Sequence, residues 1–275
     1  MRFAKLCIIL LLLIISIGVV SAADADNDTI EITPDSQYEN SGISYTFTNL
    51  SNEITKSGDT LDMQHDYMFN NESDFGYIFI DKDNFTINGN NHIIDGNKES
   101  GIFNVTGNNL TINNLVFTNG KSAIGGIIHT TGEITLNNVT FLLNNVTFIS
   151  DHTKYLGGAV ASHGGKINCY NSRFIDNHAE SGAAIFIENG ELNIKNTNIT
   201  SAIPNRYGQI WARFSTVNID GLNIINVSSR YSPAISLEKC MDTIITNSKF
   251  INLTADISAG AISLKWAGNL FYPEL

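Results

Sequence analysis

Carboxylates are the side chains here that could do acid–base chemistry, and they are scattered along the chain. Cleavage of a sugar polymer needs two or three of them, often with a Lys or Arg, converging on one surface. Asp62, Asp95, Asp151 and Asp176 follow no common spacing. We therefore assign no catalytic residue from the sequence.

Other charged residues recur at a regular interval near the carboxyl end of the chain. Glu188, Arg213 and Glu238 lie 25 residues apart, and Lys265 follows one residue out of the expected register. Alternating signs at this spacing predict a surface ladder of ion pairs, in which each pair contributes little stability. The six histidines share no ligand spacing, so we expect no metal site and no cofactor.

Four aromatic residues are the candidates for ligand contact. Tyr155, Tyr207 and Tyr231 occupy similar places in a repeating pattern, and Trp211 follows Tyr207 closely. An exposed row of such rings suits stacking against sugar rings, whereas rings that merely cover a turn are the alternative.

Eleven N-x-S/T sequons offer sites for a different chemistry, the N-linked attachment of glycans. We expect modification at Asn27, Asn104, Asn145 and Asn226. Sequons whose amide is held in a stack of asparagines, such as Asn138, should be blocked.

Most of these side chains belong to a repeated sequence pattern, and the fold of that repeat must position them. Segments of alternating apolar and polar residues begin at 61, 85, 110, 134, 167, 192, 217 and 243, and all intervals but one are 24–26 residues. Such a period is typical of solenoids. The exceptional interval is 33 residues and contains a duplication, because LNNVTF at 136–141 returns at 143–148. We expect seven residues around 142–148 to bulge outward from that coil.

Each repeat has an internal order. Its first and third residues are apolar and the residue between is usually Thr or Asn, which predicts a strand with one buried face. From the second repeat on, the fifth residue is Gly or Asn, which predicts a sharp bend with positive φ. A large apolar residue follows the bend, and a small residue opens a second apolar run. Short strands stacked on their counterparts one coil away make an all-β fold, a parallel β-helix of about eight coils over residues 61–265.

The two ends of the chain differ from the repeats. Residues 1–22 have the pattern of a signal peptide: Arg2 and Lys5, an apolar run, then small residues before a cleavage point after Ala22. An uncleaved anchor is the alternative, although the apolar run of 15 residues is short for a membrane span. Residues 23–60 should cap the first coil, because Phe47, Leu50 and Ile54 have helical spacing. Residues 266–275 are a tail that folds back as a small cap or leads into a longer chain.

The net charge limits the classes of binding partner, and the cysteine content limits the possible disulfides. After cleavage, 14 basic residues face 27 acidic ones, a formal charge of −13, which disfavours nucleic acid and anionic lipid. The mature chain keeps Cys169 and Cys240, which fall in different coils, so we expect no disulfide between them.

Two motifs resemble known families. FLLN (141–144), FIDN (174–177) and GGAV (157–160) resemble the FxxN and GGA[ILV] repeats of polymorphic membrane proteins, and FTINGNNHIIDGN (85–97) is similar to the opening of pectin-lyase-like β-helices. Together with the signal peptide and the 35 asparagines, residues 40–265 resemble the adhesin-like surface proteins of methanogenic archaea.

This resemblance implies a right-handed β-helix at the cell surface or outside the cell, with glycans or envelope polymers as partners and no membrane span after signal cleavage. A carbohydrate-active enzyme with an unrecognised site is the competing class, since fold alone does not give function.

Overall fold

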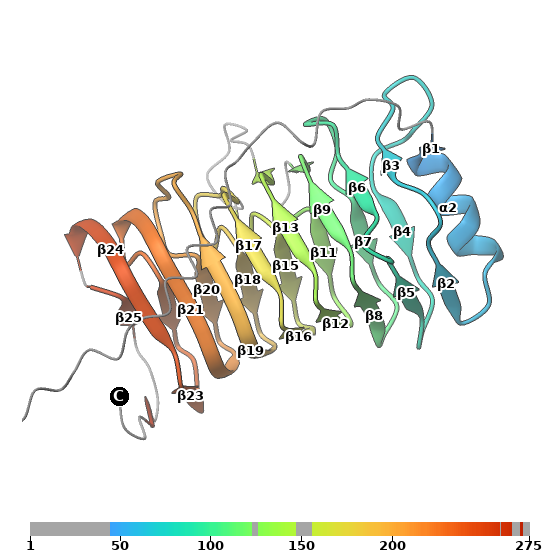
Figure 1. Ribbon diagram of the computed structural model, residues 1–275. Helices are drawn as coiled ribbons and strands as arrows, with labels where there is room; N and C mark the ends of the chain where they lie inside the picture. Colours follow the sequence, from blue (N-terminus) through green and yellow to red (C-terminus); the bar gives the residue numbers. More distant parts are fainter. Residues whose placement is uncertain (1–44, 123–125, 147–155, 259, 266–269, 272–275) are drawn as a thin grey trace, which may run out of the picture. The chain divides into compact units, whose positions relative to one another are not determined.

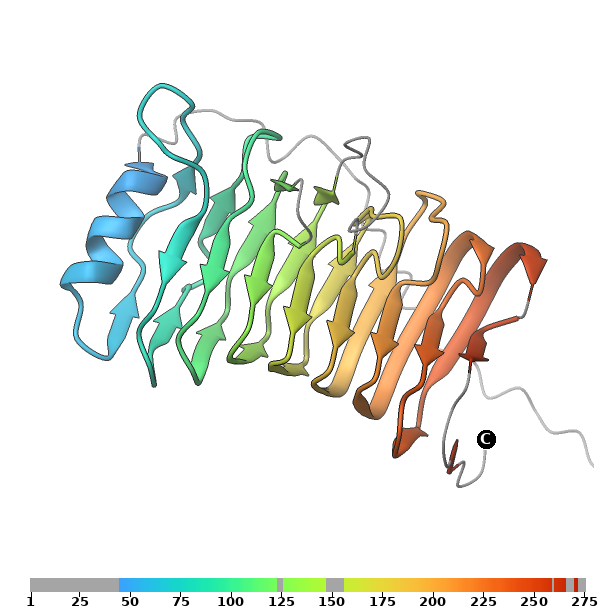
Figure 2. The ribbon, with the colours of Figure 1, turned by 180° about the vertical axis from the view of Figure 1, so that it is seen from behind.

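Parallel strands stacked one coil above another make up nearly all of the protein (Figures 1 and 2). The computed structural model describes residues 45–122, 126–146, 156–258, 260–265 and 270–271. The predicted β-solenoid of about eight coils is confirmed, because an 8-stranded parallel sheet (sheet B) takes one strand from each coil. Its strands are β4 (Ile78–Ile80), β7 (Phe103–Val105), β11 (Ile128–Thr130), β15 (Val160–His163), β18 (Ile185–Glu188), β20 (Ile210–Arg213), β22 (Ile235–Glu238) and β25 (Ile262–Lys265).

A 16-stranded sheet (sheet A) forms the rest of the wall, in two arms. The first arm follows sheet B along the chain and holds β2 (Thr60–Asp62), β5 (Thr86–Asn88), β8 (Leu110–Asn113), β12 (Glu133–Asn137), β16 (Lys166–Tyr170), β23 (Thr243–Thr246) and β26 (Leu270–Phe271). The second arm holds β1 (Tyr45–Thr46), β3 (Tyr67–Met68), β6 (Ile93–Asp95), β9 (Val116–Thr118), β13 (Thr140–Leu142), β17 (Arg173–Ile175) and β24 (Lys249–Ser258). Two long strands, β19 (Glu191–Thr200) and β21 (Thr216–Tyr231), bend through the corner and join the arms. A separate two-stranded sheet pairs β10 (Lys121–Ser122) with β14 (Asn145–Val146).

Apolar stacks fill the interior, as the repeat predicts. The third residues of successive repeats, Ile112, Leu136, Cys169, Ile194 and Ile219, pair in register and are buried. The stacking is continuous from coil to coil, so each residue contributes mainly to the contact with its two neighbours. Cys169 and Cys240 are both free and buried, which confirms that they are not joined.

Asparagines at the predicted bends adopt left-handed backbone conformations. Asn114, Asn138, Asn171 and Asn196 have φ values of 50–53°, which Asn tolerates better than other residues with a side chain. In the second repeat the bend lies one residue later than predicted, because Asn90 and Asn91, not Gly89, have positive φ.

The register of the first coil was predicted wrongly by two residues. Leu61 pairs with Ile87, not with Phe85. The reason is a polar contact that the apolar pattern does not show: this register places Asp62 below Asn88, whose Nδ2 donates to Asp62 Oδ1 over 2.7 Å. In the last coil the predicted register is confirmed, since Thr243 pairs with Val217 and Ile245 with Ile219.

The duplicated hexapeptide does not bulge where we expected. Its first copy lies in the ladder, and the chain stays in register beyond it, with Leu142 against Ile175 and Asn145 against His178. The next described contact is Leu156 with Ser181. Ten residues lie between Asn145 and Leu156, but only two between His178 and Ser181, so the eight extra residues of this coil fall there. Residues 147–155 lie outside the described residues.

A helix covers the first coil. Helix α2 (Phe47–Lys56) buries Phe47, Leu50 and Ile54, the three residues that predicted it. Two sets of side chains accept hydrogen bonds from the N–H groups at its start. Thr46 and Asn49 form a capping box, and Asp74 accepts hydrogen bonds from the backbone N–H groups of Phe47 and Thr48. Figure 1 shows the helix at the end of the stack opposite β24.

Candidate functional site

The outer face of sheet B presents one residue per coil beside the charged series. Ile185 and Ile187 point into the hydrophobic core, and strand alternation turns Phe186 between them to the other face, where it is also buried, against the rings of His163 and Trp211. Pairing in register aligns these outward residues as Phe79, Asn104, His129, Ala161, Phe186, Trp211, Ser236 and Ser263. The column thus mixes aromatic residues with small and polar ones, and its last two members are serines.

Six rings line up along this face, and we call them the aromatic row. Adjacent ring centroids lie 5.1–5.8 Å apart, and the members in order are His129, His163, Phe186, Trp211, Tyr207 and Tyr231. The last three, Trp211, Tyr207 and Tyr231, stack nearly parallel, with interplanar angles of 19° and 17°. The structure therefore brings together three of the four predicted aromatic residues. Tyr155 lies outside the described residues.

Backbone hydrogen bonds hold the two tyrosines above the sheet. The N–H of Tyr207 donates to Glu180 O over 2.9 Å, and the N–H of Tyr231 donates to Arg206 O over 2.9 Å. Trp211 comes from β20 itself. Neighbouring coils thus fix the relative height of the rings, which a platform for a rigid ligand requires.

A hollow of about 390 Å³ lies beside these three rings. Its lining combines the rings with Ser236, Glu238, Ser263 and Lys265 among other residues. All three rings are half-buried, so each keeps an accessible surface. Flat rings beside hydroxyl, carboxylate and ammonium groups are the combination that binds a ligand with both apolar faces and hydroxyl edges.

Arginines surround the stacked rings, although the chain carries a net charge of −11. The guanidinium carbons of Arg206, Arg230 and Arg213 lie 5.4–5.6 Å from the ring centroids of Tyr207, Tyr231 and Trp211 respectively. Arg206 also pairs with Glu180, and the hydrogen bond to this carboxylate raises the pKa of Arg206 above its ordinary value. These cation–π contacts favour the observed orientation of the three rings.

The predicted ladder of ion pairs is present beside the row. Arg213 lies 3.1 Å from Glu188 and 3.5 Å from Glu238, and Lys265 lies 3.6 Å from Glu238. Lys265 pairs with Glu238 in the strand register, so the expectation that it was out of register was wrong. The interval from Glu238 to Lys265 is two residues longer than the interval from Arg213 to Glu238, because the last coil is longer. The two extra residues precede β25, so β22 and β25 still pair in register.

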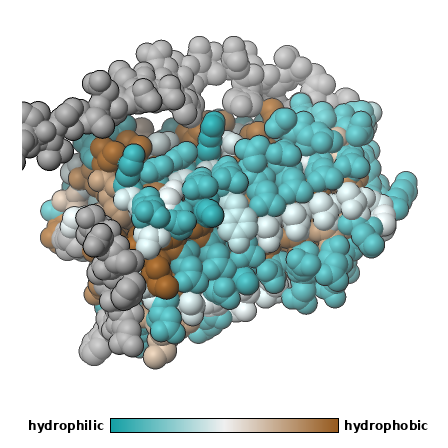
Figure 3. Space-filling view, turned by 60° about the horizontal axis from the view of Figure 1, so that its bottom comes forward, coloured by the Kyte–Doolittle hydropathy of each residue, from teal (hydrophilic) through white to brown (hydrophobic). Residues whose placement is uncertain are grey.

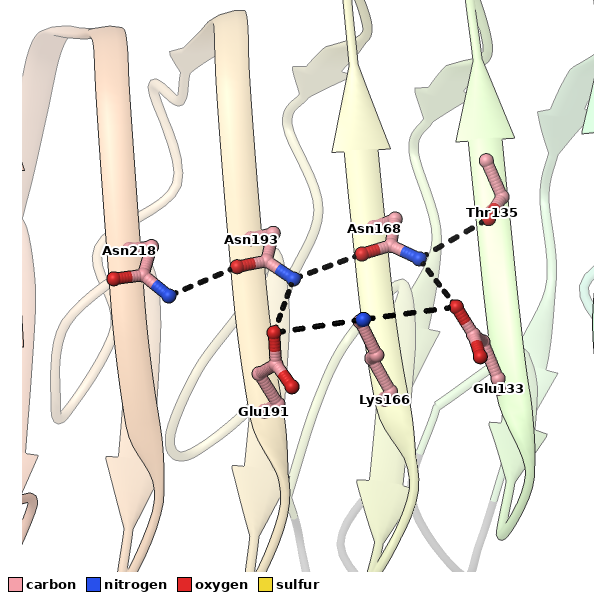
Figure 4. A network of polar contacts seen from close by, with 7 residues as sticks. All are labelled: Glu133, Thr135, Lys166, Asn168, Glu191, Asn193 and Asn218. Atoms are coloured by element: carbon pink, nitrogen blue, oxygen red, sulfur yellow. Dashed lines mark hydrogen bonds and ion pairs between the residues drawn. The ribbon is translucent and has the colours of Figure 1, made fainter.

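A second polar cluster was missed by the sequence reasoning. Lys166 Nζ lies between two carboxylates, 3.9 Å from Glu133 Oε1 and 3.5 Å from Glu191 Oε1 (Figure 4). Asn168 donates to Glu133 over 2.9 Å and Asn193 to Glu191 over 2.8 Å. The signal was available, because Gly132-Glu133, Gly165-Lys166 and Gly190-Glu191 open three successive strands.

This cluster borders a groove of about 650 Å³, which Phe214 and Met241 also line. The two distances to Lys166 Nζ place the carboxylate oxygens of Glu133 and Glu191 no more than 7.4 Å apart. Such a separation suits a pair of carboxylates in glycoside hydrolysis. A general acid, however, is usually buried and unpaired, and these side chains are 39% and 43% exposed with Lys166 between them.

The predicted sequon asparagines that the structure describes lie on the outside of the solenoid. Asn104 is half-buried in β7, between Phe79 and His129. Asn145 is exposed, and its Oδ1 lies 3.2 Å from His178 Nδ1. Asn226 is exposed and accepts a hydrogen bond from Asn252. Asn27 lies outside the described residues. Asn138 donates its amide to Asn114, as expected for a stacked asparagine.

Within the described ranges, no group of three or more His, Cys, Asp or Glu side chains could hold a metal ion. In the same part of the chain, no helix is both long and apolar enough to cross a membrane. Comparisons with models of known protein families, with curated proteins and with solved structures gave no match to this chain.

Proposed function

We propose that this protein is an exported, adhesin-like β-solenoid that acts at the cell surface or outside the cell and binds glycans or envelope polymers. The observation that carries the proposal is the stack of Tyr207, Trp211 and Tyr231 beside a hollow with polar walls. Sugar rings have an apolar face and hydroxyl edges, and this arrangement offers a surface for each.

The binding test compares variants of the row with a matched control. Tyr207→Ala and Trp211→Ala each remove a ring from the stack, so binding to a glycan identified on an array should weaken about fivefold or more. Phe79→Ala is the control, because Phe79 belongs to the same outward column, is 68% exposed and lies far along the sheet from the stack. Equal binding by all three variants would exclude the row as the site. Thermal unfolding of each variant separates lost contact from lost fold.

Export has its own test. When the full chain is produced in a secreting host, the released protein should begin at Ala23, after the small residues that precede it. Retention of residues 1–22 on the secreted or membrane-bound protein would instead support an uncleaved anchor.

A carbohydrate-active enzyme is the second candidate, and the Glu133–Lys166–Glu191 cluster is the observation in its favour. An enzyme would release new reducing ends or unsaturated products from a bound polymer. Glu133→Gln and Glu191→Gln would then abolish product release while Trp211→Ala would not. Binding without product, unaffected by either glutamine variant, supports the binding function.

A further inference from the structure

The asparagine ladders on the surface all point in one direction. In each, the amide nitrogen Nδ2 donates to the Oδ1 of an asparagine in the preceding coil. The bonds run from Asn109 to Asn84, Asn113 to Asn88, Asn137 to Asn113, Asn138 to Asn114, Asn193 to Asn168, Asn196 to Asn171, Asn218 to Asn193, Asn223 to Asn198 and Asn252 to Asn226, with lengths of 2.8–3.4 Å. Figure 4 shows part of one ladder, from Asn218 to Asn168.

Carboxylates fix this direction where they begin a ladder. Asn88 donates to Asp62, Asn119 to Asp95 and Asn247 to Asp220, over 2.7–3.1 Å. A carboxylate can only accept, so the first amide must turn its Nδ2 toward the preceding coil, and each following amide stacks the same way. A ladder that begins with an asparagine therefore leaves one Nδ2 without a partner.

Three such first asparagines are part of N-x-S/T sequons: Asn84, Asn198 and Asn226. Among the described residues, their side chains accept hydrogen bonds at Oδ1 and have no acceptor for Nδ2. Three other sequon asparagines stand second in a ladder and donate Nδ2: Asn109, Asn138 and Asn252. All six residues are exposed. The hydrogen bond of Nδ2, not burial, is what separates the two sets.

The distinction bears directly on glycan transfer. In that reaction Nδ2 forms a bond to the anomeric carbon of a sugar carried on a lipid phosphate. The bond from that carbon to the phosphate oxygen breaks, the lipid phosphate leaves with the electron pair, and a base of the transferase takes the amide proton. An Nδ2 that already donates to a ladder must first give up that hydrogen bond.

We propose that the ladders direct N-glycosylation of the folded chain: Asn84, Asn198 and Asn226 are acceptors, and Asn109, Asn138 and Asn252 are protected. Modification in the cell rests on the export included in the proposed function. The protection itself is a property of the fold, and the test below uses purified protein, so it can fail or succeed independently of export and of glycan binding.

The test uses two matched pairs, Asn84 with Asn109 and Asn226 with Asn252, since the two asparagines of each pair belong to one ladder and each lies in its own sequon. The purified, folded full chain is incubated with a single-subunit oligosaccharyltransferase and its lipid-linked oligosaccharide donor. Occupancy is measured by glycopeptide mass spectrometry and divided by that of synthetic peptides with the same sequons. In each pair, the first asparagine should be modified about five- to tenfold more than the second, the effect of one hydrogen bond.

Removal of the first asparagine of a ladder should allow glycosylation of the second. Asn84→Gly keeps the left-handed backbone and leaves the Nδ2 of Asn109 free, so occupancy of Asn109 should rise toward its peptide value. Asn226→Gly should do the same for Asn252. Equal occupancy within the wild-type pairs, no modification of Asn84 and Asn226 when the peptides are modified, or no rise at Asn109 and Asn252 in the glycine variants would each overturn the proposal.

Discussion

Asparagine serves the fold in different ways according to where its amide points. In the two FxxN motifs it is buried: Asn144 Nδ2 donates to Phe117 O over 3.1 Å, and Asn177 Nδ2 donates to Phe141 O over 3.0 Å. These amides supply hydrogen bonds to backbone carbonyls at the corner of the solenoid. On the surface the same residue type forms one-directional ladders. The motif resemblance thus has a physical basis in hydrogen bonding at a corner, which does not by itself indicate function.

Inward residues should carry most of the stability. Ile194 is 2% exposed and lies between Cys169 and Ile219, so Ile194→Ala should lower the free energy of unfolding by about 2–5 kcal/mol. Thr111 faces outward in the first arm of sheet A, and Thr111→Ala should cost about 1 kcal/mol or less. Urea denaturation of both variants checks this, and equal losses would show that the stacks do not dominate the core.

Acidification is expected to weaken the fold, because half-buried imidazoles resist protonation. Burial lowers the pKa of His129, with a further contribution from His163, and burial also lowers the pKa of His178. In the unfolded chain these groups titrate near pH 6.5. Below that pH the unfolded chain binds more protons than the folded one, so stability falls as the pH drops. The urea midpoint should therefore be lower at pH 5 than at pH 8, and His129→Gln should reduce the difference. An unchanged difference would assign it to other groups.

At the scale of elements, the coil with the duplication makes the sharpest prediction. Deletion of residues 147–154 leaves Val146 and Tyr155 between Asn145 and Leu156, the same number of residues as in the next coil. The free energy of unfolding should change by about 1 kcal/mol or less, because the strand contacts on either side of the deletion stay in register. Deletion of 142–148 should cost about 3 kcal/mol or more, since it places Asp151 where buried Asn144 now donates to a carbonyl. Equal damage by the two deletions would contradict the register seen here.

The strands, bends and helix were largely predictable from the sequence, whereas the side chains that meet between coils were less so. The period, the inward stacks and the bends follow from sequence patterns that recur from coil to coil. The helix at Phe47–Lys56 follows from the helical spacing of Phe47, Leu50 and Ile54. The bulge at 142–148 was misplaced because a duplication offers two equivalent alignments, and the chain uses the one that satisfies Asn144. The cluster around Lys166 was missed because the repeats were aligned by their inward apolar residues, which leaves outward residues of successive coils uncompared. Half of the aromatic row was missed for the same reason, since His129, His163 and Phe186 belong to three earlier coils.

At the scale of the whole solenoid, its two ends differ. Near β24 and β25 apolar side chains remain exposed, including Ile251, Ile257 and Leu264. Figure 3 shows a largely hydrophilic face on which apolar residues gather toward the end that carries β23 and β24. Since each coil contacts only its neighbours, stability should vary along the stack. At the other end, helix α2 covers the first coil, so the solenoid depends on how firmly that helix is held.

Two charged residues of the first coil hold the ends of α2. Asp74 accepts hydrogen bonds from N–H groups of its first turn. Although burial alone would raise the pKa of Asp74, hydrogen bonds from Asn70, Thr48 and Phe47 lower it overall. At the other end, Lys82 Nζ donates to Ile54 O and Ser57 O over 2.6 and 2.5 Å. An anion at the amino end and a cation at the carboxyl end both suit the helix dipole.

Loss of either contact should therefore loosen the cap without unfolding the middle of the stack. In Asp74→Ala and in Lys82→Met, amide hydrogen exchange measured by mass spectrometry should speed up about tenfold or more in α2, β2 and β4. Exchange in β16 and β18 should stay unchanged, because those strands contact only their own neighbours. Asp81→Ala is the control, since Asp81 is exposed beside Lys82 and its side chain forms no hydrogen bond or ion pair with the described residues. Because the pKa of Asp74 is lowered by folding, its contribution is present above about pH 4 and is lost as the pH falls further. In Asp74→Ala that contribution is already absent. Lowering the pH below about 4 should therefore change the exchange of α2 in this variant only through the intrinsic pH dependence of amide exchange. Faster exchange throughout the solenoid in either variant would show that it unfolds as one cooperative unit and that the helix is not a local cap.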